Sequence, residues 1–116
     1  MHDIAQNQVD AWKSQLKKGP LELAVLTLLN SKRRYGLELL EELNEHNLAI
    51  SDGSIYPLLS RLRDEKKVTA EWVDEGSGHA HKYYQLTSHG KQTLQGMLLA
   101  WREYTVAIDR LINTSK

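Results

Sequence analysis

Residues 51–87 hold the pattern that most constrains this chain, a helical segment followed directly by a glycine-centred hairpin. In the first half, apolar residues recur on one helical face, at Ile55, Leu58, Leu59 and Leu62. In the second half, two strand-like segments, 68–74 and 82–87, flank a linker that contains Gly76 and Gly78. Glycine adopts the positive φ values that tight turns need. The stretch therefore predicts a helix that leads into a two-stranded hairpin.

A helix followed by such a hairpin is the ending of a winged helix. In that arrangement the helix enters the major groove of DNA, and the hairpin, called the wing, lies over the neighbouring backbone. We expect the helix over residues 54–66, with Ser54 as its N-cap and Pro57 within its first turn, because proline lacks an N–H group. Tyr83 and Tyr84 alternate along the second strand, so we expect one in the core and the other outside it.

The segment before this unit predicts three further helices. An apolar stripe at Ala5, Val9, Trp12 and Leu16 predicts a helix over residues 3–18, which we expect to stop at Gly19-Pro20. Because proline suits the first position of a helix, a second helix is predicted over 20–31. A polar connection over 31–34 then leads to a third helix over 35–46, for which the inward residues are expected to be Leu37, Leu40 and Leu43.

The last helix, predicted over residues 87–113, carries a heptad seam. The seam consists of Leu94, Met97, Trp101, Tyr104, Ile108 and Leu111. About 25 residues reach ~37 Å, which exceeds a domain of this size, so we expect a second copy of the chain to cover the seam, with Val9 and its stripe alongside. The alternative is a hairpin between the first and last helices of one chain. The expected parts are an N-terminal helix (1–18), a winged-helix domain (19–87) and a dimerisation helix (88–116).

The composition of the chain limits the classes of fold, site and partner that are possible. The 116 residues suffice for one compact, mainly α domain with a small β part (α+β), and the absence of cysteine excludes disulfides and cysteine-based zinc sites. We find no secretory signal and no apolar run near the ~20 residues that span a bilayer, so we expect a cytoplasmic protein without a membrane partner. The 15 basic and 15 acidic residues cancel, which counts against nucleic-acid binding. Basic residues nevertheless gather at 32–34 and at 61–67, beside the helix–hairpin unit.

Several segments together resemble the PadR family of bacterial transcriptional regulators. They are KGPLEL (18–23), YG (35–36), GSIYPLLSRL (53–62), KYYQLT (82–87) and Gly90. The resemblance extends from about Trp12 to Ile112. It implies a winged-helix homodimer joined by its C-terminal helix, which represses promoters and is often released by small aromatic or hydrophobic compounds.

Two positions depart from the family pattern. Lys66-Lys67-Val68 stands where the family usually has a glycine turn, and a lysine in a left-handed turn costs roughly 1 kcal/mol. The wing carries His79 to Lys82 where the family commonly has arginine, so we expect a weaker and more pH-dependent contact there.

The DNA-binding candidates lie on the outward face of the predicted recognition helix, at its flanks and on the wing. Arg61 is the only residue of the outward face that is able to bind guanine with two hydrogen bonds, and the sequence leaves open which residue reads a base. For each candidate the alternative is an ordinary surface position. The set is Tyr35, Ser54, Tyr56, Pro57, Ser60, Arg61, Lys67, His81 and Lys82.

Other kinds of site have weaker support. Two copies of Trp101 meeting at a two-fold axis, with Met97 and Trp12 nearby, would sandwich a planar aromatic effector, although the same residues also suit a dimer core. His79 and His81 have no third ligand at a metal-site spacing, so no metal or cofactor is expected. No catalytic motif is present, which argues against an enzyme.

The sequence thus predicts a dimeric, sequence-specific DNA-binding repressor with double-stranded, palindromic operator DNA as its partner. The alternative is a winged-helix module that binds a ligand or a protein but not DNA.

Overall fold

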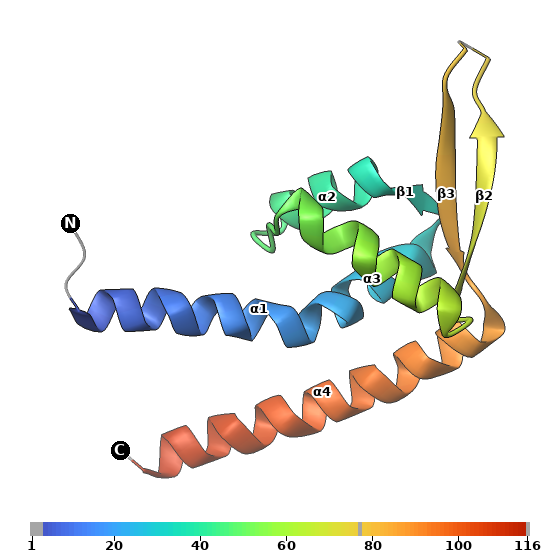
Figure 1. The fold of residues 1–116 in the computed structure, drawn as a ribbon. Helices are drawn as coiled ribbons and strands as arrows, with labels where there is room; N and C mark the ends of the chain where they lie inside the picture. The colour runs from blue at the N-terminus through green and yellow to red at the C-terminus, as the bar shows by residue number, and fades with distance from the viewer. Residues whose placement is uncertain (1–3, 77, 116) are drawn as a thin grey trace.

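The computed structural model describes residues 4–76 and 78–115. The predicted first residue of the N-terminal helix, Asp3, and Ser77 at the wing tip lie outside this part. The elements follow in the order α1 (Ile4–Ser31), β1 (Arg34–Tyr35), α2 (Gly36–Glu45), α3 (Asp52–Asp64), β2 (Val68–Asp74), β3 (Ala80–Leu86) and α4 (Ser88–Thr114). The fold is a winged helix, as predicted: α2 and α3 pack beside the carboxyl-terminal half of α1, the β2–β3 hairpin projects at one end, and α1 and α4 extend away at the other (Figure 1).

The core confirms the predicted apolar face of α3. Ile55, Leu59 and Leu62 are fully buried, and Leu58 is nearly so. They pack with residues of α1 and of the sheet, and these partners include Val25, Leu26, Leu29, Val68, Tyr84 and Leu86.

The inward face of α2 was predicted partly wrongly. Leu43 is buried and Leu40 half-buried, but Leu37 is 53% exposed and Leu39 is completely buried. Leucines at 37, 39, 40 and 43 make several sides of this helix apolar. The pattern therefore allows two orientations, and packing against α1 and α3 selects the one that buries Leu39.

The sheet has three antiparallel strands in the order β1-β3-β2. We predicted a polar connection over 31–34, but Arg34 and Tyr35 form a strand that pairs with Tyr84 and Tyr83. Arg34 is buried and is satisfied there: its guanidinium donates to the Leu28 carbonyl oxygen and forms a 3.0 Å ion pair with Glu42. Two residues are too few to show a strand pattern, so β1 could be found only from its partner.

The predicted break at Gly19-Pro20 is wrong, because α1 continues from Ile4 to Ser31 with Pro20 inside it. A proline removes one backbone hydrogen bond and crowds the carbonyl of residue i−4, here Leu16. Residues 11–19 are exposed, so water can satisfy that carbonyl. The expected boundary between residues 18 and 19 therefore falls inside a single helix.

The helix α3 also begins earlier than predicted. Its N-cap is Ser51 rather than Ser54, and Pro57 lies beyond the first turn. Ser54 belongs to the helix, where its backbone N–H donates to the Ser51 carbonyl (3.0 Å) and the two hydroxyls are 3.0 Å apart. The helix ends at Asp64 rather than Lys66, because Lys66 adopts the left-handed conformation (φ 62°) expected for this turn. Gly76 and Gly78 of the wing also have positive φ, as predicted.

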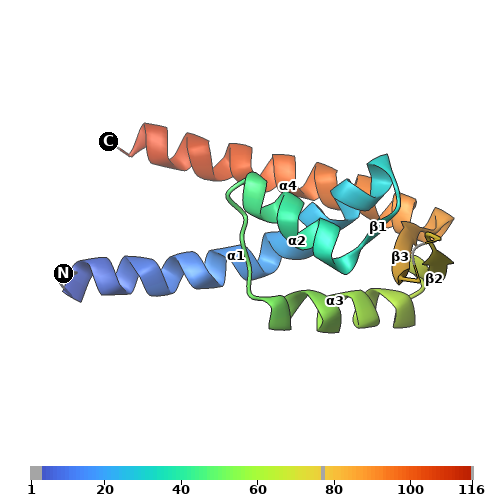
Figure 2. The same ribbon diagram turned by 90° about the horizontal axis from the view of Figure 1, so that it is seen from above.

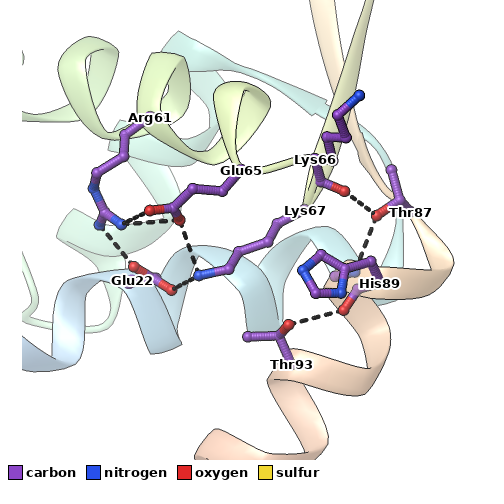
Figure 3. Close-up of polar contacts among 9 residues, drawn as sticks. Glu22, Arg61, Glu65, Lys66, Lys67, Thr87, His89 and Thr93 are labelled. Atoms are coloured by element: carbon purple, nitrogen blue, oxygen red, sulfur yellow. Dashed lines mark hydrogen bonds and ion pairs between the residues drawn. The ribbon is translucent and has the colours of Figure 1, made fainter.

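The turn between α3 and β2 is joined to the start of α4 through Thr87. The Thr87 hydroxyl donates to the Lys66 carbonyl (2.7 Å) and accepts a hydrogen bond from Gly90 N–H (3.0 Å), so it also caps α4 (Figure 3). The Thr87 N–H donates to the Lys67 carbonyl (3.1 Å). Close contact at this junction is possible because residue 90 has no side chain: a Cβ there would overlap the Lys67 carbonyl oxygen.

Gly90→Ala is therefore expected to lower the free energy of unfolding by about 1–3 kcal/mol or more, because rigid backbone must move to admit the methyl group. Gly96→Ala is the matched control, since nothing lies within 4 Å of a Cβ at that position of the same helix. There the change should be neutral or stabilising by up to ~1 kcal/mol. Urea unfolding of both variants at equal protein concentration measures the difference, and equal effects would contradict the proposed overlap.

Candidate nucleic-acid interface

The outward face of α3 is open to solvent. Figure 2 shows α3 along one side of the molecule, with α4 on the far side of α1 and α2. Ser54, Pro57 and Ser60 are exposed, while the opposite face of the helix is buried. Small side chains let a helix approach base edges and phosphates closely, so this face has the shape that a major groove accepts.

Tyr56 occupies one flank of α3 and packs against the start of α2. Its ring lies so close to Gly36 that a Cβ at that residue would come within 2.6 Å of it. Tyr56 remains 51% exposed. Two sequence-predicted residues, Tyr35 and Tyr56, therefore lie at one junction, between the first turn of α2 and the middle of α3.

Arg61 occupies the other flank and belongs to a cluster of four charged residues, which we call the Glu22 cluster: Glu22, Arg61, Glu65 and Lys67. The Arg61 guanidinium donates to Glu22 (2.7 Å) and to Glu65 (3.1 Å). The Lys67 ammonium donates to the other Glu22 oxygen (3.0 Å) and forms an ion pair with Glu65 (2.9 Å). Figure 3 shows the resulting ring of contacts between α1, the end of α3 and the turn that follows it.

The charges in this cluster support one another. Burial opposes ionisation of Glu22, but the hydrogen bonds from Arg61 and Lys67 outweigh it and lower the pKa of Glu22 below its ordinary value. Burial likewise disfavours the charged form of Lys67, yet its two carboxylate partners raise its pKa. All four groups are therefore charged at neutral pH, and the cluster has no net charge. A phosphate must compete with two carboxylates for Arg61 or Lys67.

The wing divides its predicted contacts between two faces. Side chains alternate along a strand, so His81 and Lys82 point to opposite sides of the sheet. On one side, the His81 ring stacks on Tyr35 (4.2 Å between ring centres), and Tyr35 meets Tyr83 edge-on. On the other side, Lys82 lies 5.9 Å from the centre of the exposed Trp72 ring.

Tyr83 and Tyr84 separate as predicted. Tyr84 is buried in the core, and burial raises its pKa. The Tyr83 hydroxyl donates to Glu75, and this hydrogen bond is the main cause that raises the pKa of Tyr83 to about 12. The Arg33 guanidinium lies 4.8 Å above the Tyr83 ring. Tyr83 therefore stays protonated and links the middle of β3 to Glu75 beside the wing tip.

Two residues of this region were missed from the sequence. Arg63 is exposed on α3, and within the described residues it forms no ion pair. Its spacing of seven from Tyr56 places both on one flank, which a helical wheel would have shown. Glu22 lies 39 residues before Arg61, and no local pattern links them.

The comparisons with known proteins agree with this geometry. The model of the transcriptional regulator PadR-like family matches residues 25–96, which include α2, α3, the wing and the start of α4. The chain belongs to the PadR-like family. Members of this family are transcriptional regulators rather than enzymes.

Relatives extend the match beyond these residues. A crystal structure of a PadR family transcriptional regulator from Eggerthella lenta is similar over 93% of this chain and 95% of its own, with a TM-score of 0.85 and 28% identity. Bacillus subtilis PadR in complex with operator DNA is similar over 67% of this chain and 45% of its own, with a TM-score of 0.63 and 31% identity. An uncharacterised protein of Lysinibacillus sphaericus is 30% identical over 84% of this chain and 92% of its own.

Outside the winged helix, this PadR-like protein exposes apolar side chains on its two long helices. On α1 they are Val9, Trp12 and Leu16, and on α4 they are Trp101, Tyr104, Ile108 and Leu111. Leu94 and Met97 differ from the rest of the seam: Leu94 is buried in the core of its own chain, and Met97 packs against that core. No helix of the described residues has both the length and the apolar character needed to cross a bilayer.

A cavity of about 610 Å³ opens between these helices. Trp101, Leu98 and Leu16 lie along its α4 and α1 sides, but Trp12 and Met97 do not line it. Lys13, Lys17 and His46 also border it. Among the described residues, no group of three or more side chains is arranged to hold a metal ion, and His79 does not gather further ligands.

Proposed function

We propose that this protein is a homodimeric, sequence-specific DNA-binding repressor that acts in the cytoplasm. The main support is the exposed face of α3, at Ser54, Pro57 and Ser60, within a family of transcriptional regulators. In this proposal α3 enters the major groove, and Lys82 of the wing contacts the backbone. The related Bacillus subtilis PadR has been crystallised with operator DNA, which supports the same ligand class here.

Charge distribution explains how a chain without net charge can bind DNA. Arg61 and Lys67 are neutralised within the Glu22 cluster, whereas Arg63 and Lys66 form no ion pair among the described residues. We therefore add Arg63 and Lys66 to the predicted contacts Tyr35, Tyr56, His81 and Lys82. Arg61 remains a candidate because its side chain is 49% exposed, although a phosphate must displace a carboxylate to reach it.

The dimer is proposed from the uncovered apolar residues of the arms. On an isolated chain, exposure of these apolar side chains to water costs free energy, and a two-fold partner would cover them. Examples are Trp12, Tyr104 and Leu111. A two-fold dimer presents two copies of α3, so the operator should be palindromic, with half-sites about one helical turn (~10 base pairs) apart or a multiple of that spacing.

Selection of bound fragments from random duplex DNA, at 50 mM and at 200 mM salt, tests this function. We expect a palindromic motif to be enriched, and we expect its affinity to fall steeply between the two salt concentrations. Recovery of no motif, with binding absent at both concentrations, would leave the alternative of a winged-helix module that binds a ligand or a protein.

A second proposed function is the binding of a small planar aromatic effector at Trp101. The cavity beside Trp101 supports it, because its walls are mainly apolar and it exceeds 300 Å³, the lower size of common ligand sites. The variant Trp12→Phe/Trp72→Phe leaves Trp101 as the one tryptophan of the chain. Its fluorescence should be quenched on titration with planar aromatic compounds, and unchanged emission across a panel of them would rule this site out.

A further inference from the structure

We propose that Glu22 is a positioning residue for DNA recognition: by pairing with Arg61 and Lys67, it holds α3 against α1 and keeps two cations from binding DNA phosphates non-specifically. This inference rests on the proposed DNA-binding function. Glu22 lies on α1, outside the proposed recognition helix α3 and the wing. In this proposal it controls the ratio of specific to non-specific DNA affinity.

The geometry of the carboxylate supports this assignment. Each Glu22 oxygen has its own partner, Arg61 at 2.7 Å and Lys67 at 3.0 Å. These partners lie on either side of the end of α3, at Asp64. Among the described residues, these are the ion pairs that join α1 to the α3–β2 segment. The Glu22 side chain is only 16% exposed, so the contact is shielded from solvent ions more than a surface pair is.

The charge balance supports the second half of the proposal. Two carboxylates and two cations share the cluster, so loss of one carboxylate leaves one positive charge without a full partner. Arg61 is 49% exposed, and it can turn towards solvent when released. A released cation beside the DNA-facing helix contacts phosphates whatever the sequence, because phosphates carry no sequence information directly.

Glu22→Gln tests the proposal because the amide keeps the size of the carboxylate and removes its charge. The full-length variant is compared with the wild type on two duplexes of equal length, the selected operator and a scrambled sequence, over a range of salt. Each additional phosphate contact steepens the slope of log K against log salt by ~0.9, because it releases bound counterions from the DNA. We expect the slope on scrambled DNA to steepen by about one, and the operator-to-scrambled affinity ratio to fall about tenfold.

Two further variants separate this effect from a general change in charge. Glu45→Gln removes the same charge from an exposed position on α2, where no ion pair is present among the described residues, and we expect a much smaller change in slope. Adding Arg61→Gln to Glu22→Gln should return the slope towards the wild-type value, because the released cation is then absent.

Glu65→Gln removes the other carboxylate of the cluster from an exposed position and keeps the test available if Glu22→Gln fails to fold. It should steepen the slope in the same direction. If the Glu22→Gln and Glu65→Gln variants show the same slopes and affinity ratios as Glu45→Gln, the role proposed for Glu22 is wrong, whereas operator binding by the wild type still supports the proposed function. If the wild type binds no DNA, the proposed function itself is wrong.

Discussion

Ile108→Asp is expected to leave the protein monomeric and to lower its operator affinity by about a hundredfold or more. Ile108 lies on α4 in line with Trp101, Tyr104 and Leu111, all exposed on the isolated chain. In the proposed dimer, an aspartate at this position would be buried without a partner charge. A dimer that binds both half-sites at once gains a factor of about 10²–10⁴ in affinity, and a monomer loses this factor.

Light scattering coupled to gel filtration measures the mass of this variant, and operator titration measures its affinity. Gln92→Asp is the matched control, because it adds the same charge to an exposed position of the same helix, on the side away from the seam. A dimeric Ile108→Asp protein with wild-type affinity would show that α4 does not form the dimer.

Ser60→Glu should reduce operator affinity by about a hundredfold without lowering stability. Ser60 is exposed on the outward face of α3, so the longer side chain meets no core residue. In the proposed complex its carboxylate would face DNA phosphates at close range, where like charges repel and a desolvated charge has no partner. Like charges that face each other across an interface typically reduce the binding free energy by several kcal/mol.

Fluorescence anisotropy with labelled operator measures the loss, and thermal unfolding checks that the fold is intact. The control is Gln95→Glu, which adds one negative charge at an exposed site on α4. If Ser60→Glu binds the operator as tightly as this control, α3 does not present that face to DNA.

Local patterns were enough to predict the recognition unit. The spacing of Ile55, Leu58, Leu59 and Leu62 places all of them in the core, because one face of a helix must be buried and these are the apolar residues on it. The left-handed turn at Lys66 was expected from the resemblance alone, because the family usually has a glycine in this turn. Errors at the start of α3 stayed within one turn, where Ser51 and Ser54 are both able to cap a helix.

Prediction failed where distant parts of the chain decide the outcome. Gly19-Pro20 is a typical helix boundary, yet α1 continues through it, since the carbonyl that loses its backbone hydrogen bond lies on an exposed part of the helix that water can reach. The short strand β1 exists because β3 lies beside it, some fifty residues later in the chain. Leu39 rather than Leu37 is buried because α1 and α3 pack on that side of α2.

The sequence by itself determined the winged helix and, to within one turn, the positions of α3 and the wing, because periodic apolar residues and turn glycines act over a few residues. The family followed from the motifs in residues 53–62 and 82–87. Only the tertiary structure decided that Arg61 and Lys67 are paired with Glu22, 39 and 45 residues earlier in the chain. A charged side chain on a helix shows no local trace of its partner, since the Coulomb interaction depends on distance in space and not on separation along the chain.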